Sequence, residues 1–305
     1  MASSELRIGF IGIGVLGKGL ALALDRQGYQ VAGVYSRTTT SARWLAERLE
    51  GCRCHESAQQ LAVAADVIFI TTPDAAIASV AKEISWRPAQ GVVHCSGASG
   101  RALIQDVIPD GVSAGAFHPF QTFAGILEPA EAAERLNGVT FAVSAEGWLA
   151  EFLEGVAASF GGRAVAITDE QRPVYHASAI LSCGYLATLV GASVEIWQTL
   201  GFSPEEAIRA IHPLARATLE NIQRQGFPDC VTGPLVRGDV DTVHSHLEAL
   251  ESRQPQLVPL YRELTRLSLP LAHRRGVADP QLAELRQLVL DFSQTQNGRL
   301  EQCPE

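Results

Sequence analysis

The stretch Arg7-Ile8-Gly9-Phe10-Ile11-Gly12-Ile13-Gly14-Val15-Leu16-Gly17 decides the fold of the N-terminal half of the chain. A short apolar run ends in the spacing G-x-G-x-x-G, and the ten residues that follow have a helical pattern. The order strand, tight turn and helix favours a dinucleotide, because the three glycines allow the turn, the approach of a pyrophosphate and close packing of helix on strand. Free amides at the helix start would bind the phosphates. The residues predicted to form this phosphate site are Gly12, Ile13, Gly14, Val15, Leu16 and Gly17.

Length and composition are those of a globular protein with room for two domains. The chain has 305 residues, of which 47% are hydrophobic and 19% are charged. A net charge of −9 and the lack of a basic run argue against nucleic acid as a partner. We identify no apolar stretch of the ~18 residues that a membrane span needs and no signal-peptide core. We therefore expect a cytoplasmic protein with no membrane partner.

The six cysteines are scattered, which indicates reduced thiols rather than a disulfide framework. Cys52, Cys54 and His55 are metal-ligand types, but no second cluster completes a tetrahedral site. We predict no metal.

Strand and helix patterns alternate up to about residue 168. Continuous apolar runs such as Val67 to Thr71 are typical of buried parallel strands, whereas the chain after Asp169 has helical patterns only, among them one long helix from Val174 to Leu200. The class is therefore α/β: a Rossmann domain with a doubly wound, mostly parallel sheet in residues 1–168, then an all-helical domain in residues 169–305. We expect the helical domain to dimerise, because the long helix is apolar on more than one face, and we also expect it to contact the substrate.

The end of the second predicted strand indicates which cofactor binds. Sites that prefer NAD have an acidic residue there, roughly 20 residues beyond the glycines, for the ribose 2′-hydroxyl. This chain has Ser36, Arg37 and Thr38 instead. A guanidinium and hydroxyls are groups that hold a 2′-phosphate, so we predict NADP(H); the alternative is that Arg37 is a solvated loop charge.

Polar residues and glycines follow three further strands. Because ligands of open α/β sheets lie beyond the carboxyl ends of the strands, these residues are expected to face the nicotinamide half of the cofactor. They are Thr71, Thr72 and Pro73, then Ser96 and Gly97, and finally His118 with Pro119.

Reduction of a carbonyl needs a proton donor beside its oxygen, and Lys18 and Lys82 are the only lysines. His118, at a strand end, and His176, on the first long helix, suit acid/base chemistry near neutral pH; the alternatives are a strand-end cap and a packed helix residue. Arg237 and Asp239 lie in a dense loop. They either bind the substrate's acidic group, together with Ser96, or form an ion pair or helix cap.

Several segments together resemble a known family. They are the glycine motif, His94-Cys95-Ser96-Gly97-Ala98, Phe117-His118-Pro119-Phe120-Gln121, Tyr175-His176-Ala177 and Thr232-Gly233-Pro234 with Arg237-Gly238-Asp239. The chain resembles Rossmann-type NADP oxidoreductases whose helical C-terminal half is a domain of unknown function. More distantly, it is similar to pyrroline-5-carboxylate reductases, 3-hydroxyisobutyrate and 6-phosphogluconate dehydrogenases, ketopantoate reductases and arogenate/prephenate dehydrogenases. The resemblance implies a helical domain that dimerises and closes the site.

One departure from these relatives affects the mechanism. Hydroxyacid dehydrogenases of that group use a lysine and an asparagine on the first helix of the second domain, and Tyr175 to Tyr185 contains neither. We expect an NADP(H)-dependent oxidoreductase that transfers a hydride between NADPH and a small keto or hydroxy acid or an imine. The alternatives are a ketopantoate-like reductase and a non-catalytic NADP(H) sensor.

Overall fold

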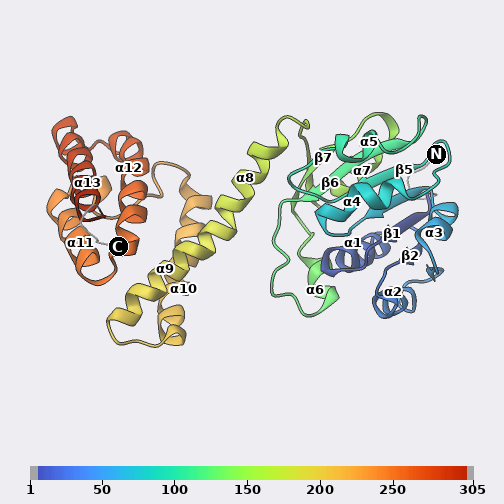
Figure 1. The fold of residues 1–305 in the computed structure, drawn as a ribbon, viewed down its shortest axis with the longest axis horizontal. Helices are drawn as coiled ribbons and strands as arrows, with labels where there is room; N and C mark the ends of the chain where they lie inside the picture. Colours follow the sequence, from blue (N-terminus) through green and yellow to red (C-terminus); the bar gives the residue numbers. More distant parts are fainter. Residues whose placement is uncertain (1–5, 301–305) are drawn as a thin grey trace. The chain divides into compact units, whose positions relative to one another are not determined.

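The computed structural model describes the backbone of residues 6–300 and the side chains of residues 6–290. Within these residues, an eight-stranded sheet has the order β3-β2-β1-β4-β5-β6-β7-β8 (Figure 1). Its strands are β1 (Ile8–Ile11), β2 (Val31–Tyr35), β3 (Arg53–Cys54), β4 (Val67–Ile70), β5 (Gly91–His94), β6 (Ser113–Pro119), β7 (Thr140–Ser144) and β8 (Arg163–Ala166). β6 and β7 pair antiparallel, and the other neighbours pair in parallel. The predicted α/β class with a mostly parallel sheet is confirmed.

The strand order reverses between β1 and β4, because the chain first runs outward to β3 and then returns to the other side of β1. Such a switch point leaves a crevice at the carboxyl ends of the two strands. The glycine turn lies at this end of β1, so the topology itself positions a ligand there.

Helices cover both faces of the sheet. One face bears Phe10, Phe69 and Phe117, with Phe10 stacked on Phe69 at a ring distance of 5.2 Å, and packs against α1, α2, α6 and α7. Figure 1 shows α1 and α6 side by side on this part of the sheet. The opposite face bears Ile68 and Ile70 and packs against α3, α4 and α5. The bounds are α1 (Val15–Arg26), α2 (Thr39–Ala46), α3 (Ala58–Ala64), α4 (Asp74–Lys82), α5 (Ala102–Gln105), α6 (Pro129–Glu134) and α7 (Gly147–Ser159). The two short helices α5 and α6 have no counterpart in the sequence prediction.

The strand β6 is two residues longer than the pattern predicts. Its last four residues pair with the antiparallel β7, with His118 opposite Ala142 and Pro119 opposite Phe141. His118 therefore belongs to the sheet itself, where backbone hydrogen bonds fix its position, rather than to the loop after a strand.

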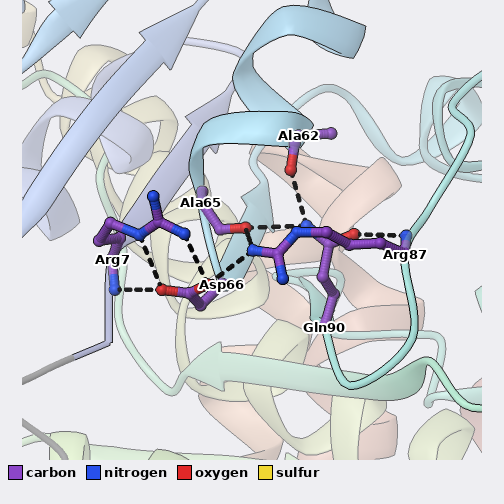
Figure 2. Close-up of polar contacts among 6 residues, drawn as sticks. All are labelled: Arg7, Ala62, Ala65, Asp66, Arg87 and Gln90. Atoms are coloured by element: carbon purple, nitrogen blue, oxygen red, sulfur yellow. Dashed lines mark hydrogen bonds and ion pairs between the residues drawn. The ribbon is translucent and has the colours of Figure 1, made fainter.

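A network of charged and amide groups joins the amino ends of β1 and β4 to the segment before β5, and Figure 2 shows it. Asp66 accepts hydrogen bonds from the backbone and side chain of Arg7 at 3.0 Å and from Arg87 at 2.6 Å. Arg87 and Gln90 also donate to the carbonyl of Ala65, each at 2.8 Å. This network lies at the amino ends of the strands, whereas the glycine turn lies at their carboxyl ends, so we expect the network to support stability rather than function.

We expect Asp66→Asn to lower the free energy of unfolding at pH 7 by about 1–2 kcal/mol, since both arginine partners are half exposed and screened by water. Hydrogen bonds from Arg7 are the main reason that the pKa of the Asp66 carboxyl lies below its usual value of 3.8. Its contribution is therefore complete above about pH 4 and decreases as the pH falls further. Urea unfolding at pH 7 and pH 3 should show a difference between wild type and variant that shrinks at pH 3. The control is Glu131→Gln, from an exposed i,i+4 pair with Arg135, which should change stability by less than about 0.5 kcal/mol.

The apolar segment after β8 forms two helices, α8 (Arg172–Ser182) and α9 (Gly184–Thr199), interrupted at Cys183. The sequence pattern predicts one continuous helix here. The segment also corrects the expectation that the chain has no stretch of membrane-spanning length. Taken together, Arg172–Thr199 spans 28 residues with a mean hydropathy of 1.6, and by length and composition it could cross a membrane.

The remaining helices are α10 (Pro204–Gln225), η2 (Leu235–Arg237), α11 (Val240–Arg253), η3 (Pro255–Leu257), α12 (Val258–Arg274) and α13 (Asp279–Leu300). Their core contains Val243, Leu247, Leu269 and Leu285. Ser203 begins α10 with the capping box that its sequence predicts. The chain divides into compact units at Met1–Gly184 and Tyr185–Glu305. The helical C-terminal region is confirmed, while the boundary at residues 168 and 169 stays a prediction.

Candidate active site

The turn after β1 has the geometry that its three glycines predict. Gly12 has a φ of +92°, which L side chains rarely adopt, and a Cβ there would stand 2.9 Å from the backbone nitrogen of Thr72. A Cβ on Gly17 would stand 2.5 Å from the carbonyl oxygen of Gly12. At Gly14, the N-cap of α1, a Cβ would meet nothing within 4 Å. Gly12 and Gly17 thus allow the turn and the helix to pack closely, and Gly14 leaves the space at the N-terminus of α1 open.

A cavity of about 680 Å³ lies beside this turn, within the first unit. It unites three segments that the sequence places far apart. Of the predicted cofactor residues, it is lined by Gly12, Ile13, Gly14, Ser36, Arg37, Thr38, Thr71, Thr72 and Pro73. Val15, Leu16, Gly17, Ser96 and Gly97 are not among its lining residues.

Thr71 and Thr72 have different roles at the end of β4. The Thr71 hydroxyl donates to the Gly12 carbonyl and so ties β4 to the glycine turn. The Thr72 hydroxyl is buried and has no hydrogen-bond partner in the part of the chain that the structure describes. A buried polar atom without a partner beside a glycine turn fits a site that is completed by a polar ligand.

The cavity is also lined by residues that the sequence pattern does not indicate. Ser57 and Gln59 come from the start of α3, and Ser79 and Glu83 come from α4 and its C-cap. The one feature of the sequence that could have indicated these four residues is their position after β3 and β4, because the helices that follow these strands flank the crevice. Arg37 remains exposed, and the Ser36 hydroxyl accepts a hydrogen bond from the Thr38 amide at 3.3 Å.

Ser96 follows β5 and is held from several sides. Its hydroxyl donates to Asp74 at 2.6 Å, and its amide donates to Nδ1 of His94 at 3.2 Å. Nε2 of His94 lies 2.8 Å from the Gly100 carbonyl, so His94 is a neutral imidazole with its proton on Nε2. Burial lowers the pKa of His94, in agreement with this state. Because Ser96 is 2% exposed, its side chain is part of the wall of the site, and the predicted contacts with substrate and cofactor stay predictions.

The two predicted catalytic histidines lie close together. The rings of His118 and His176 are 6.2 Å apart and nearly perpendicular, although they come from β6 and α8. Both approach Gly97, since a Cβ there would stand 2.6 Å from Cδ2 of His176 and 2.8 Å from Nε2 of His118. A glycine at the end of β5 therefore lets both imidazoles reach the turn where the nicotinamide is expected.

Tyr175 and Arg172 complete this cluster; the sequence places Tyr175 beside His176 in one of the family segments but gives no indication of a role for Arg172. The Tyr175 hydroxyl lies 2.8 Å from Nδ1 of His118. Arg172 is fully buried and donates to the carbonyls of Ser96 at 3.4 Å and Ala142 at 3.2 Å. Its guanidinium lies 5.8 Å from the Tyr175 ring centroid, and its Nε has no hydrogen-bond partner among the described residues. Tyr175 could have been found from the sequence, because it is the neighbour of His176. Arg172 could not, because nothing in the pattern around it indicates burial.

The cluster affects the charge of its members. Burial, followed by the charge of Arg172, lowers the pKa of His118 to about 4. Burial raises the pKa of Tyr175 to about 12, against the opposing effect of Arg172. At neutral pH, His118 is therefore uncharged and Tyr175 keeps its phenolic proton.

Arg237 and Asp239 belong to the second unit. Asp239 is the N-cap of α11, and it accepts hydrogen bonds from the Thr242 amide at 3.1 Å and the Thr242 hydroxyl at 2.7 Å. These bonds lower the pKa of Asp239. Asp239 thus has the capping role that was one of the two alternatives. Arg237 ends η2 and is exposed. A substrate role for either residue stays a prediction.

A glycine turn with a positive φ at a switch point, next to a cavity along the carboxyl edge of a parallel sheet, defines a dinucleotide-binding domain. Residues 7–99 match the family described as "NADP oxidoreductase coenzyme F420-dependent". Residues 139–268 match a domain of unknown function, DUF2520. The chain therefore joins a segment of this NADP oxidoreductase family to a DUF2520 segment, and NADP(H) is confirmed as its class of cofactor.

Solved structures share the fold. A Bacteroides fragilis protein described as an NADP oxidoreductase is 25% identical, covers 87% of this chain and 98% of its own, and has a TM-score of 0.67. A Thermotoga maritima protein is 23% identical, covers 88% of this chain and 100% of its own, and has a TM-score of 0.72. Among curated proteins, 2-(hydroxymethyl)glutarate dehydrogenase from Eubacterium barkeri is 36% identical over 73 residues, 24% of this chain. The match spans only 23% of the length of that enzyme.

Proposed function

We propose that this protein uses NADPH to reduce a small keto acid or an imine to the hydroxy acid or amine. The observation that supports this most directly is the His118–Tyr175–His176 cluster at the carboxyl ends of β5 and β6. It lies at the same edge of the sheet as the cavity beside the glycine turn. The short match to a hydroxy-acid dehydrogenase agrees with such a substrate, although it covers only a small part of that enzyme.

The residues beside the glycine turn fit a dinucleotide, because the turn admits no side chain at Gly12 and the Thr72 hydroxyl has no partner among the residues that the structure describes. The pyrophosphate would bind the amides of Ile13 to Leu16 at the start of α1. Ser36, Arg37 and Thr38 would hold the 2′-phosphate. When bound, NADPH supplies the hydride.

The other residues would act on the substrate. His118 and His176 would hold the proton that joins the reacting oxygen or nitrogen. Ser96, which its hydrogen bond to Asp74 holds in place on the turn after β5, would form part of the wall that contacts the substrate and the cofactor. Arg237 would bind the acidic group of the substrate, with Asp239 fixing the loop that carries Arg237.

The test is a screen for NADPH oxidation with keto acids, ketopantoate among them, and cyclic imines, followed by deuterium transfer from each face of the labelled cofactor. Transfer from a single face to one class of substrate is the expected result. Tight and stoichiometric NADPH binding with no turnover across the whole screen would instead support the non-catalytic sensor.

We expect Arg37→Ala to weaken NADPH binding by roughly 5- to 150-fold, which corresponds to the about 1–3 kcal/mol of a charged hydrogen bond. Binding of NADH should not change, because NADH has no 2′-phosphate. Fluorescence titration with both cofactors measures the two constants. The control is Arg53→Ala, an exposed arginine on β3 that does not line the cavity. A wild-type protein that binds NADH more tightly than NADPH would contradict the role of Arg37.

We also propose a homodimer through the helical domain. The support is α9, which is apolar yet has no buried residue in the part of the chain that the structure describes, and exposed apolar side chains such as Tyr185. Light scattering at micromolar concentration is expected to give twice the chain mass of 32.7 kDa. A monomer, or a protein that stays in solution only with detergent bound to this segment, would contradict the dimer.

A further inference from the structure

The contact between Tyr175 and His118 joins two groups that both hold protons at neutral pH. The hydroxyl lies 2.8 Å from Nδ1, and the ring planes are nearly perpendicular, with centroids 5.6 Å apart. The other ring nitrogen of His118, Nε2, faces the bare Cα of Gly97 at the end of β5. The imidazole therefore stands between the phenol and the turn where we place the reacting part of the cofactor.

The direction of this hydrogen bond follows from the chemistry of its partners. A phenol O–H is a good donor, and a neutral imidazole has one nitrogen that accepts and one that donates. If the phenol donates to Nδ1, the ring proton must be on Nε2, because the bond at one nitrogen fixes the tautomer of the other. Nε2–H then faces Gly97, at the end of β5 where we place the substrate.

We propose that Tyr175 is a positioning residue and the proton source behind His118: it holds His118 as the Nε2–H tautomer and replaces the proton that Nε2 gives to the substrate. This inference rests on the proposed function. As the hydride reaches the substrate carbon, the Nε2–H bond breaks and an O–H or N–H bond forms on the product. The Oη–H bond of Tyr175 breaks and Nδ1–H forms. One proton from solution then reaches Nε2 as the proton on Nδ1 passes back to the phenolate, so each turnover consumes one proton from solution.

The surrounding charges favour this route over an imidazolium donor. Arg172 of α8, which lies beside the Tyr175 ring, stabilises a phenolate and opposes a positive charge on His118. His176 of α8 acts on His118 in the same direction, and Asp74 of α4 acts against it. With the pKa of His118 at about 4, an imidazolium is scarce at neutral pH, whereas the relay keeps His118 uncharged while the proton passes to the substrate.

The first experiment needs no substrate. The full-length protein with ¹⁵N-labelled histidine is studied by long-range ¹H–¹⁵N correlation, and the His118 signals are assigned with His118→Gln. At pH 7 we expect a protonated Nε2 and a bare Nδ1. In Tyr175→Phe, an Nδ1–H fraction should appear and the pKa of His118 should rise. Tyr185→Phe, which changes an exposed tyrosine, should leave the spectrum unaltered. An Nδ1–H tautomer or an imidazolium in the wild type would overturn the proposal.

The second experiment uses any substrate found in the screen. Rates in mixtures of H₂O and D₂O should show two protons in flight for the wild type and one for Tyr175→Phe. The variant should turn over at least about 10-fold more slowly with unchanged NADPH affinity. A single proton in flight in the wild type would overturn the relay. A failed screen would refute the proposed function, while the spectra would still decide whether Tyr175 sets the tautomer of His118.

Discussion

Replacing Gly17 with alanine is expected to weaken NADPH binding by about 10- to 100-fold and to lower the free energy of unfolding by about 1–3 kcal/mol, the usual cost of overpacking. The added Cβ would stand 2.5 Å from the Gly12 carbonyl oxygen and 2.6 Å from the Thr71 hydroxyl. The carbonyl is backbone and cannot rotate away, so α1 must move from the turn after β1. That movement displaces the amides that would bind the pyrophosphate.

Gly14→Ala is the matched control for this effect. A Cβ at Gly14 meets nothing within 4 Å, and its φ of −81° suits alanine, so stability should remain within about 0.5 kcal/mol of the wild type. NADPH binding should still weaken, because the methyl group would stand where the pyrophosphate approaches. Thermal unfolding and fluorescence titration separate the two variants. If Gly17→Ala bound NADPH as the wild type does, the turn would not be the phosphate site.

Local pattern was enough to predict most of the first domain. The glycine spacing and the apolar runs are features of neighbouring residues, and they identified β1, the turn and the parallel strands in their correct places. The helical pattern after Asp169 was equally clear. The antiparallel pairing of β6 with β7 depends on contacts between distant segments, so periodicity could not predict it or the extra length that includes His118 in the sheet.

The candidate site was predictable only in part, for the same reason. Residue type, together with a place next to a strand end or a helix start, is enough to predict His118 and His176. Arg172 is charged and precedes a proline, which indicates an exposed helix start, yet it is fully buried under Ser96 and Ala142. Only the three-dimensional contact of the first turn of α8 with Ser96 and Ala142 reveals this burial. The same packing also joins Tyr175 to His118.

The largest effect on turnover is expected for His118→Gln, which should lower kcat by roughly 100-fold or more, the usual range for a lost general acid. Glutamine keeps a polar side chain of similar length but cannot relay a proton between Tyr175 and the substrate. His176→Gln should lower turnover less if His118 donates the proton, since the hydrogen bond to Tyr175 is made by His118. NADPH affinity should stay the same in both variants, because neither residue lines the cavity beside the glycine turn.

Steady-state rates and NADPH titrations for these two variants therefore show which histidine gives the proton to the substrate. The control is His212→Gln, an exposed histidine on α10, which should behave as the wild type. A larger loss at His176 than at His118 would exchange the roles of the two histidines. Near wild-type turnover in both variants would place the chemistry elsewhere, with Arg172 the next residue to test, since its charge is buried beside Ser96 and its Nε has no partner among the described residues.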